Sequence, residues 1–191
     1  MTLMSLPLEH SPTSPLVDSR ARFEAIYRQE LAWVVRTVER LGARERDLED
    51  LVHDVFLAFY RTMDGYDPAR PLRPWLFGVA FRVVSDYRRK ASFSREAPDP
   101  SRAEEARHHG PTPADSLEVN EKRRLVLSAL ETLPLDQRAV FVAVELDERP
   151  VPEVAETLQI PLNTAYSRLR LGRQRFAAAI ERHTLQDGGT R

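Results

Sequence analysis

Hydrophobic residues recur at helical spacing between residues 48 and 62. They fall at i, i+3, i+4, i+7 and i+11, which predicts an amphipathic helix with one buried stripe. The stripe consists of Leu48, Leu51, Val52, Val55 and Phe59. The opposite face carries Asp50 and Asp54 beside an apolar Leu57, with Asp47 and His53 nearby. Acids near a helix N-terminus are often only a solvated surface, but Leu57 among them favours a docking site for a basic partner.

A second pattern, between residues 151 and 176, predicts two short helices joined by a tight turn. The first helix has apolar residues at helical spacing, and a proline interrupts the pattern before it resumes. The two stripes are Val151, Val154, Ala155 and Leu158, then Ala165, Leu169, Gly172 and Phe176. Asn163 is suited to cap the second helix, because its side-chain carbonyl can accept a hydrogen bond from an unpaired amide. The pattern is that of a helix-turn-helix.

The exposed side of that second helix carries residue types that contact DNA. Arginine pairs with guanine, asparagine or glutamine with adenine, and hydroxyl groups with bases or phosphates. The candidate contacts are Asn163, Thr164, Tyr166, Ser167, Arg168, Arg170, Arg173 and Gln174. An arginine-rich surface helix without a ligand is the ordinary alternative. The preceding helix and the proline turn favour DNA binding.

Aromatic and basic residues alternate in the segment PLRPWLFGVAFRVVSDYRRK. Aromatic side chains at this density usually fill a core, and Leu76, Val79, Ala80 and Val83 are expected to do so. Aromatic rings beside cations also hold single-stranded nucleic acid, because bases stack on the rings while the cations follow the phosphates. The pattern leaves both roles open for Trp75, Phe77, Phe81 and Tyr87, which lie among Arg73, Arg82, Arg88, Arg89 and Lys90.

Composition excludes several classes of protein. The chain has 191 residues, 42% of them hydrophobic and 30% charged, without a run of 18 apolar residues or a signal peptide, so we expect a cytoplasmic protein that is not inserted in a membrane. It has no cysteine, which excludes disulfides, thiolate metal sites and a cysteine nucleophile. His53, His108 and His109 do not suggest a metal site. We expect no catalytic residue, no metal and no cofactor.

Charge is segregated along the chain although the net charge is only −1. Residues 165–182 contain five arginines and one glutamate, whereas residues 45–54 contain five acids and one arginine. Such segregation indicates two kinds of partner, one polyanionic and one basic.

The chain divides into two helical blocks. We expect a disordered tail over residues 1–21, a first domain over 22–90, a flexible linker over 91–120, a second domain over 121–183 and a tail over 184–191. The linker has four prolines and few large apolar residues, so it cannot bury enough surface to fold alone. No strand pattern occurs, and the expected fold class is all-α: two small helical domains joined by a flexible linker, the second a helix-turn-helix.

Four motifs in order carry a family resemblance. They are DLEDLVHDVFLAFYR, WLFGVAFRVVSDYRRK, LETLPLDQRAVFVAVEL and VPEVAETLQIPLNTAYSRLRLGRQRF. Together they resemble the extracytoplasmic-function (ECF, group IV) sigma factors of bacterial RNA polymerase, in the sigma-70 family, over residues 22–183. The resemblance implies a factor that is not an enzyme, binds core RNA polymerase, and directs promoter recognition and transcription initiation.

The resemblance also implies where the partners bind. The first domain would dock on the clamp helices of the large polymerase subunit through Asp47, Asp50, His53, Asp54, Phe56 and Leu57. It would capture single-stranded, flipped-out bases of the minus-10 element through Arg73, Trp75, Arg82, Asp86, Tyr87, Arg88, Arg89 and Lys90. The second domain would contact the polymerase flap and read the double-stranded minus-35 element through its second helix. The family commonly uses an anti-sigma factor, which is a further candidate partner.

Some positions depart from the family pattern. Gln159 stands where glycine is common, and a non-glycine residue at positive φ there would cost on the order of 1 kcal/mol. Asn163 and Tyr166 stand where glycine and lysine are frequent, and Phe81 and Arg82 also differ, so promoter preference is expected to be unusual. The alternative function is a helix-turn-helix repressor or activator acting as a dimer on a palindrome, which leaves the acidic helix with Leu57 unexplained.

Overall fold

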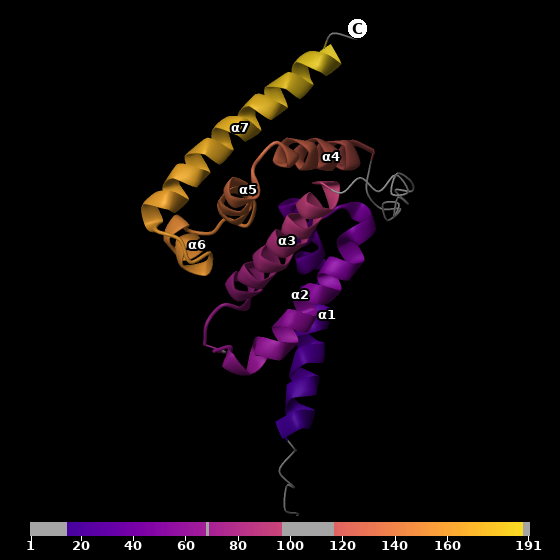
Figure 1. Ribbon diagram of the computed structural model, residues 1–191, viewed down its shortest axis with the longest axis vertical. Coiled ribbons are helices and arrows are strands. Elements are labelled where there is room, and N and C mark those ends of the chain that lie inside the picture. Colours follow the sequence, from indigo (N-terminus) through magenta and orange to yellow (C-terminus); the bar gives the residue numbers. More distant parts are fainter. Residues whose placement is uncertain (1–14, 68, 97–116, 189–191) are drawn as a thin grey trace, which may run out of the picture. The chain divides into compact units, whose positions relative to one another are not determined.

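The computed structural model describes residues 15–67, 69–96 and 117–188 (Figure 1), and every element in these ranges is helical. The elements of the first block are α1 (Pro15–Leu41), η1 (Glu45–Asp47), α2 (Leu48–Thr62), η2 (Met63–Gly65) and α3 (Leu72–Glu96). Those of the second are α4 (Leu117–Glu131), α5 (Leu135–Phe141), the π-helical turn η4 (Val142–Leu146), α6 (Val151–Thr157) and α7 (Leu162–Gly188). The all-α prediction is confirmed for this part of the chain. None of the described helices is long and apolar enough to span a membrane.

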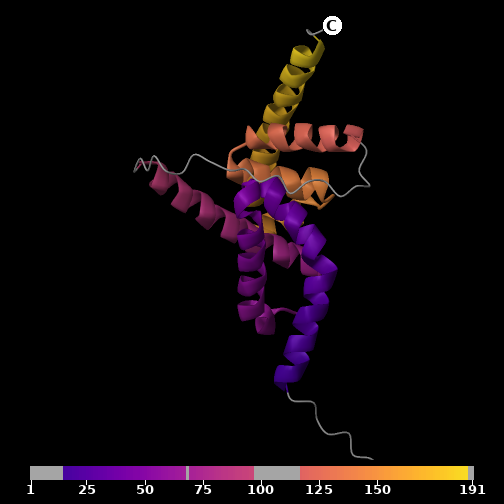
Figure 2. The ribbon, with the colours of Figure 1, turned by 90° about the vertical axis from the view of Figure 1, so that its right-hand side faces the viewer.

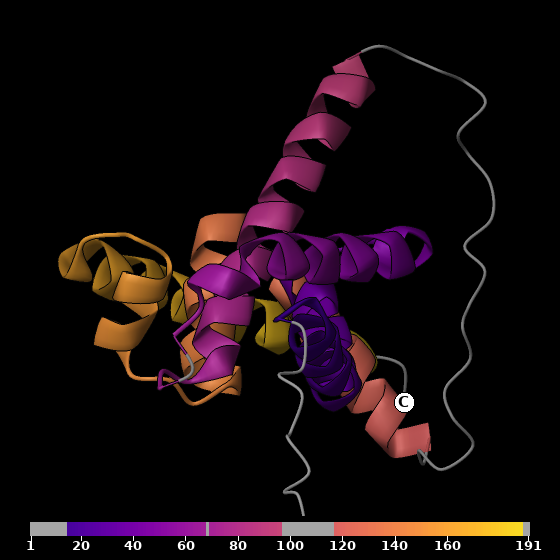
Figure 3. The same cartoon turned by 90° about the horizontal axis from the view of Figure 1, so that it is seen from below.

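Several helices are longer than the sequence pattern indicates. Helix α1 begins at Pro15, inside the segment expected to be a tail, and proline fits the first turn of a helix because that turn leaves its amides unbonded. An i,i+4 ion pair between Glu24 and Arg28 supports the first half of this helix. Helix α3 runs as one helix to Glu96 (Figure 3), and α7 continues to Gly188. Of the predicted linker, residues 97–116 lie outside the described residues, as do residues 1–14 of the predicted tail.

Contacts divide the chain into two compact units, Met1–Leu31 and Ala32–Arg191. Within the second unit, α2 packs against α3. The predicted helix over residues 48–62 is confirmed, and four of its five stripe residues are buried; Leu48 is half-buried. On α3, Leu76, Val79 and Ala80 are buried as predicted, together with Val84 instead of Val83.

The predicted helix-turn-helix is present as α6 and α7. Both α5 and α6 pack on α7, which is one long continuous helix (Figures 1 and 2). Gly172 permits the close approach of α5, since a Cβ there would lie 3.4 Å from the Gln137 carbonyl oxygen and 3.4 Å from Phe141 Cβ. Phe141 also stacks on Phe176, with ring centroids 4.7 Å apart. These contacts orient α7 so that its opposite side is exposed.

The turn between α6 and α7 contains a residue at positive φ, and the predicted cap of α7 is wrong. Gln159 has a positive φ of 54°, the conformation that explains glycine at this position in the family pattern. Asn163 was expected to cap α7, but the helix starts at Leu162, and the Ala165 amide donates to the Pro161 carbonyl at 3.1 Å. Asn163 therefore lies in the first turn, because the helix begins directly after the proline, and its side chain is exposed.

Candidate nucleic-acid interface and docking face

The exposed side of α7 presents the predicted DNA-contacting residues. Ala165, Leu169 and Gly172 are buried against the preceding helices, so the other side faces solvent. The exposed members of the predicted set are Asn163, Tyr166, Ser167, Arg170, Arg173 and Gln174, while Thr164 and Arg168 are half-buried. The structure therefore gathers six of the eight on one accessible surface.

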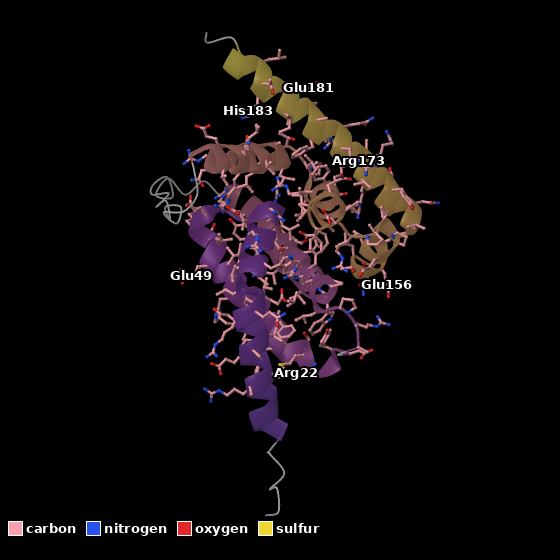
Figure 4. All side chains as sticks on the ribbon, turned by 180° about the vertical axis from the view of Figure 1, so that it is seen from behind. Arg22, Glu49, Glu156, Arg173, Glu181 and His183 are labelled. Atoms are coloured by element: carbon pink, nitrogen blue, oxygen red, sulfur yellow. The ribbon has the colours of Figure 1, made fainter. Side chains whose placement is uncertain are left out.

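Two of the arginines on α7 are paired with carboxylates that the sequence pattern did not connect to them. Arg168 Nε lies 3.1 Å from Asp136 Oδ2 on α5. Arg173, labelled in Figure 4, donates from Nε and Nη2 to Glu145 Oε1 on η4, at 2.8 and 2.6 Å. Arg170 has no carboxylate partner in the described ranges. Among Arg168, Arg170 and Arg173, it is Arg170 whose guanidinium is not neutralised by a carboxylate of the described residues.

The structure separates the roles of the aromatic residues on α3. Phe77 is buried in the core. Trp75 is half-buried and stacks on Tyr66, with ring centroids 5.1 Å apart, and it meets Phe59 edge-on at 5.2 Å. Trp75 is thus held in an aromatic cluster and keeps part of its surface accessible, as a base-stacking platform requires.

Tyr87 is fixed by Asp47, a residue predicted for docking. The Tyr87 hydroxyl donates to Asp47 Oδ2 at 2.6 Å, across 40 positions of sequence. Burial raises the pKa of Tyr87 above its usual 10.0, and the hydrogen bond and the charge of Asp47 raise it further. The bond ties the middle of α3 to η1, which leads directly into α2.

The remaining polar residues predicted for the minus-10 element lie along α3. Asp86 and Arg89 form an ion pair with Nη2 2.9 Å from Oδ1, and both side chains are exposed. Arg82 and Lys90 are also exposed. Arg73 lies over the ring of Trp33, with its guanidinium carbon 5.6 Å from the centroid. Arg88 is half-buried, and its Nη1 is buried without a hydrogen-bond partner.

Most of the residues on α2 that were predicted to dock on polymerase are exposed. Asp50, His53 and Asp54 are exposed around Leu57, which is 36% exposed. Tyr60, one turn further along, is 47% exposed and extends the apolar part of the face; the sequence prediction missed it, although its i+3 spacing from Leu57 was a signal. His53 belongs to no cluster of three or more metal-ligating side chains within the described residues.

Phe56 is the exception on this helix. Its side chain is only 2% exposed, because it points into the α2–α3 core beside the predicted stripe. A partner surface cannot reach it without unfolding the helix, so we leave Phe56 out of the docking face.

Arg138 on α5 is a charged residue that the sequence pattern did not single out. It is 2% exposed, and burial lowers its pKa from 12.5 to about 10, as does the neighbouring Arg88, while Glu131 acts in the opposite direction. Its guanidinium lies against Gly42, where an added Cβ would be 2.0 Å from Nη1. Gly42 has a φ of 100°, so glycine is required there for both conformation and space.

Two family models match the chain. The family model described as Sigma-70 region 2 matches residues 26–93, and the model described as Sigma-70, region 4 matches residues 123–176. The first contains α2 and α3, and the second contains the helix-turn-helix. Both predicted motifs therefore fall inside regions that define this family.

Two curated proteins that the chain resembles are sigma factors. The chain is 25% identical over 162 residues to "ECF RNA polymerase sigma factor SigE" of Mycolicibacterium smegmatis, covering 85% of this chain and 63% of that one. It is 25% identical over 170 residues to "RNA polymerase sigma factor CnrH" of Cupriavidus metallidurans, covering 86% and 88%.

Two solved structures share the fold. One is CnrH in complex with the cytosolic domain of CnrY, at 23% identity and a TM-score of 0.59, covering 85% of this chain and 89% of that one. The other is the sigma factor RpoE in complex with the anti-sigma factor NepR from Bartonella quintana, at 22% identity and a TM-score of 0.63, covering 81% and 96%. With both sigma regions matched in order on the all-α fold, the chain belongs to the extracytoplasmic-function sigma factors of the sigma-70 family.

Proposed function

We propose that this chain binds core RNA polymerase and directs promoter recognition and transcription initiation, with no catalytic step of its own. The observation that carries the proposal is that one chain combines an acidic and apolar docking face on α2 with an exposed recognition helix, α7. A factor that only bound DNA would need the second and not the first. Since polymerase and promoter DNA are cytoplasmic in bacteria, the site of action is the cytoplasm.

Docking on the clamp helices of the large subunit is assigned to Asp50, His53, Asp54 and Leu57, extended by Tyr60. Exposed apolar side chains ringed by carboxylates suit a basic partner with an apolar centre. Asp47 contributes through its bond to Tyr87, which links the docking helix to α3. The second domain is assigned the contact with the polymerase flap.

Strand capture at the minus-10 element is assigned to α3 and the preceding turn. Unstacking a base step costs a few kcal/mol, so a factor that holds opened DNA needs stacking surface as well as positive charge. The half-exposed Trp75, held by Tyr66 and Phe59, supplies the stacking surface. The charge comes from Arg73, Arg82, Arg88, Arg89 and Lys90, and Asp86 orients Arg89.

Reading of the minus-35 element is assigned to the exposed side of α7. The exposed Asn163, Ser167, Arg170 and Gln174 suit contacts with base edges in the major groove, with Thr164 and Tyr166 beside them. Arg168 and Arg173, already held by carboxylates, suit phosphate contacts that fix the register of the helix.

A regulatory protein is a further proposed partner. CnrH and RpoE were each solved with a bound protein, the cytosolic domain of CnrY and the anti-sigma factor NepR. An anti-sigma factor for this chain would compete with polymerase for the same surfaces.

Reconstitution with core polymerase tests the proposal. The purified chain should form a stoichiometric complex with core enzyme and support initiation from promoters mapped after its overexpression. A stable homodimer that binds a palindromic operator without polymerase would instead establish the repressor or activator alternative.

A further inference from the structure

A cavity lined by arginines lies within the unit Ala32–Arg191. Its volume is about 320 Å³. Part of the wall comes from the end of α1 and the start of α3, as Trp33, Arg36, Arg40 and Arg73. The rest is the segment between η4 and α6, residues 146–149.

The arginines of this cavity are arranged on one surface. Arg36 and Arg40 are one helical turn apart, so their side chains lie on the same side of α1. Arg73 joins them from α3, where the ring of Trp33 lies 5.6 Å below its guanidinium and holds it in place. Three guanidinium groups thus face one space, and Arg149 adds a fourth from the opposite wall.

Asp147 occupies this cationic space. Its side chain is 9% exposed, and Oδ1 accepts a hydrogen bond from Arg40 Nη1 at 3.2 Å. Its second oxygen, Oδ2, is buried without a hydrogen-bond partner, and so is Nε of Arg149. Burial raises the pKa of Asp147 even though Arg40, Arg149, Arg73 and Arg36 all act to lower it. The carboxylate is therefore an imperfect ligand for the surrounding arginines.

A phosphate group would satisfy the site better than one carboxylate. It offers more acceptor oxygens, and the planar guanidinium can bind it through two hydrogen bonds at once. A single DNA strand carries phosphate groups in series, and such a series suits several arginines along one surface. Arg73 also heads α3, the helix to which capture of the opened strand is assigned, so the same strand can continue from α3 onto α1.

We propose that Arg36, Arg40 and Arg73 form a phosphate-backbone site for single-stranded promoter DNA, and that Asp147 fills this site when the chain is free. The inference rests on the proposed function, because it extends the strand-binding surface of α3. Binding to the strand then requires the segment around Asp147 to leave the arginines. The free chain holds this part of its DNA surface covered.

Binding of a labelled 12-nucleotide thymidine strand to the full chain, without polymerase, tests the inference. Asp147→Lys places a cation among the arginines, so the segment should leave them, and the strand should bind about tenfold tighter than to the unmodified chain. The dependence of log Kd on log salt should steepen by about 2, since each single-strand phosphate neutralised contributes about 0.7. Adding Arg36→Glu and Arg73→Glu to Asp147→Lys should abolish the gain.

Glu181→Lys is the matched control. It makes the same change of charge at an exposed residue of α7 that does not line the cavity. It should tighten binding less than threefold. Equal gains from both lysine variants, or an equal gain for a 12-base-pair duplex, would overturn the inference in favour of general charge attraction.

Two further measurements keep the result interpretable. Circular dichroism must show unchanged helicity in the variants. Asp147→Asn, which keeps the shape of the side chain, should also tighten binding of the DNA strand, by a smaller factor than Asp147→Lys. Unchanged strand affinity in either variant would overturn the inference. Complex formation with core polymerase is measured separately. If the chain forms a normal complex with polymerase but Asp147→Lys binds the DNA strand no more tightly, only the covered site is refuted. If the unmodified chain forms no complex with polymerase, the proposed function itself is refuted.

Discussion

Arg173 on α7 donates two hydrogen bonds to one carboxylate oxygen of Glu145, a residue 28 positions earlier in the chain. The Arg173 side chain is exposed, so DNA can reach it, but Glu145 neutralises it in the free protein. The pair connects the recognition helix to the π-helical turn η4. It also means that DNA has to compete with Glu145 for this arginine.

Glu145→Gln should therefore raise affinity for duplex DNA of any sequence. Releasing Arg173 makes one more cation available, so the slope of log affinity against log salt should steepen by about 0.9. Fluorescence anisotropy over a series of salt concentrations measures the affinity and its salt dependence. Glu181→Gln removes the same charge from the exposed end of α7 (Figure 4), and an identical slope change there would show that net charge, not the pair, is responsible.

Arg170→Ala should reduce discrimination among upstream elements. Its guanidinium is exposed and has no carboxylate partner in the described ranges, so a bidentate contact with guanine is available to it, worth about 1–3 kcal/mol at one base pair. Binding of holoenzyme to a panel of single-base promoter variants measures the loss. Arg175→Ala, on the same helix, should weaken all members of the panel alike. The same uniform loss for Arg170→Ala would make Arg170 a phosphate contact.

Leu57→Asp and Asp54→Arg should each abolish binding to core polymerase. The first places a charge in the apolar centre of the docking face, and the second reverses one of its carboxylates. Both side chains are exposed or nearly so, hence helicity and thermal stability should be retained. Glu181→Arg is the control for charge reversal, because Glu181 (Figure 4) is exposed on α7 and does not belong to the docking face. Loss of assembly in the control as well would remove the assignment of this face.

Gln159→Gly and Glu148→Gly should each stabilise the chain by about 1 kcal/mol. The two residues have φ values of 54° and 53°, where an L side chain is strained and glycine is not. Urea denaturation at neutral pH gives the change in free energy of unfolding. Gly42→Ala should act oppositely, because its φ is 100° and the added Cβ would meet Arg138. Unchanged stability in both glycine variants would contradict the strain.

Tyr87→Phe should lower the free energy of unfolding by about 1 kcal/mol at pH 7, the contribution of its hydrogen bond to Asp47. The pKa of Tyr87 is raised in the folded state, so the folded chain favours the neutral phenol. Stability linked to this group is fully present below the unfolded pKa of about 10 and is lost as pH rises through the folded value. The difference in free energy of unfolding between the unmodified chain and Tyr87→Phe should narrow above pH 10. A gap that stays constant to pH 11 would show that Tyr87 titrates normally.

Local patterns in the sequence were sufficient for the helices and for the identity of the two regions. The stripe on α2, the two helices of the helix-turn-helix, the positive φ of Gln159 and the exposed Leu57 all follow from the spacing of residues within about a dozen positions or from the family motifs. Helical periodicity depends on neighbours only, which is why it can be predicted from one chain. Helix ends were less certain, as the early starts of α1 and α7 show, because capping depends on which groups tertiary packing leaves unbonded.

Tertiary structure decided which charged and aromatic residues are available to a partner. Phe56 turned out to be core, Asp47 is held by Tyr87, and Glu145 neutralises Arg173. The cavity that encloses Asp147 combines residues more than 100 positions apart. Such pairs depend on how helices cross in space, and no periodicity within a helix encodes the residue that a neighbouring helix will place opposite. The sequence by itself therefore determined the family and the elements, and the packing of those elements determined which side chains are exposed to DNA and polymerase.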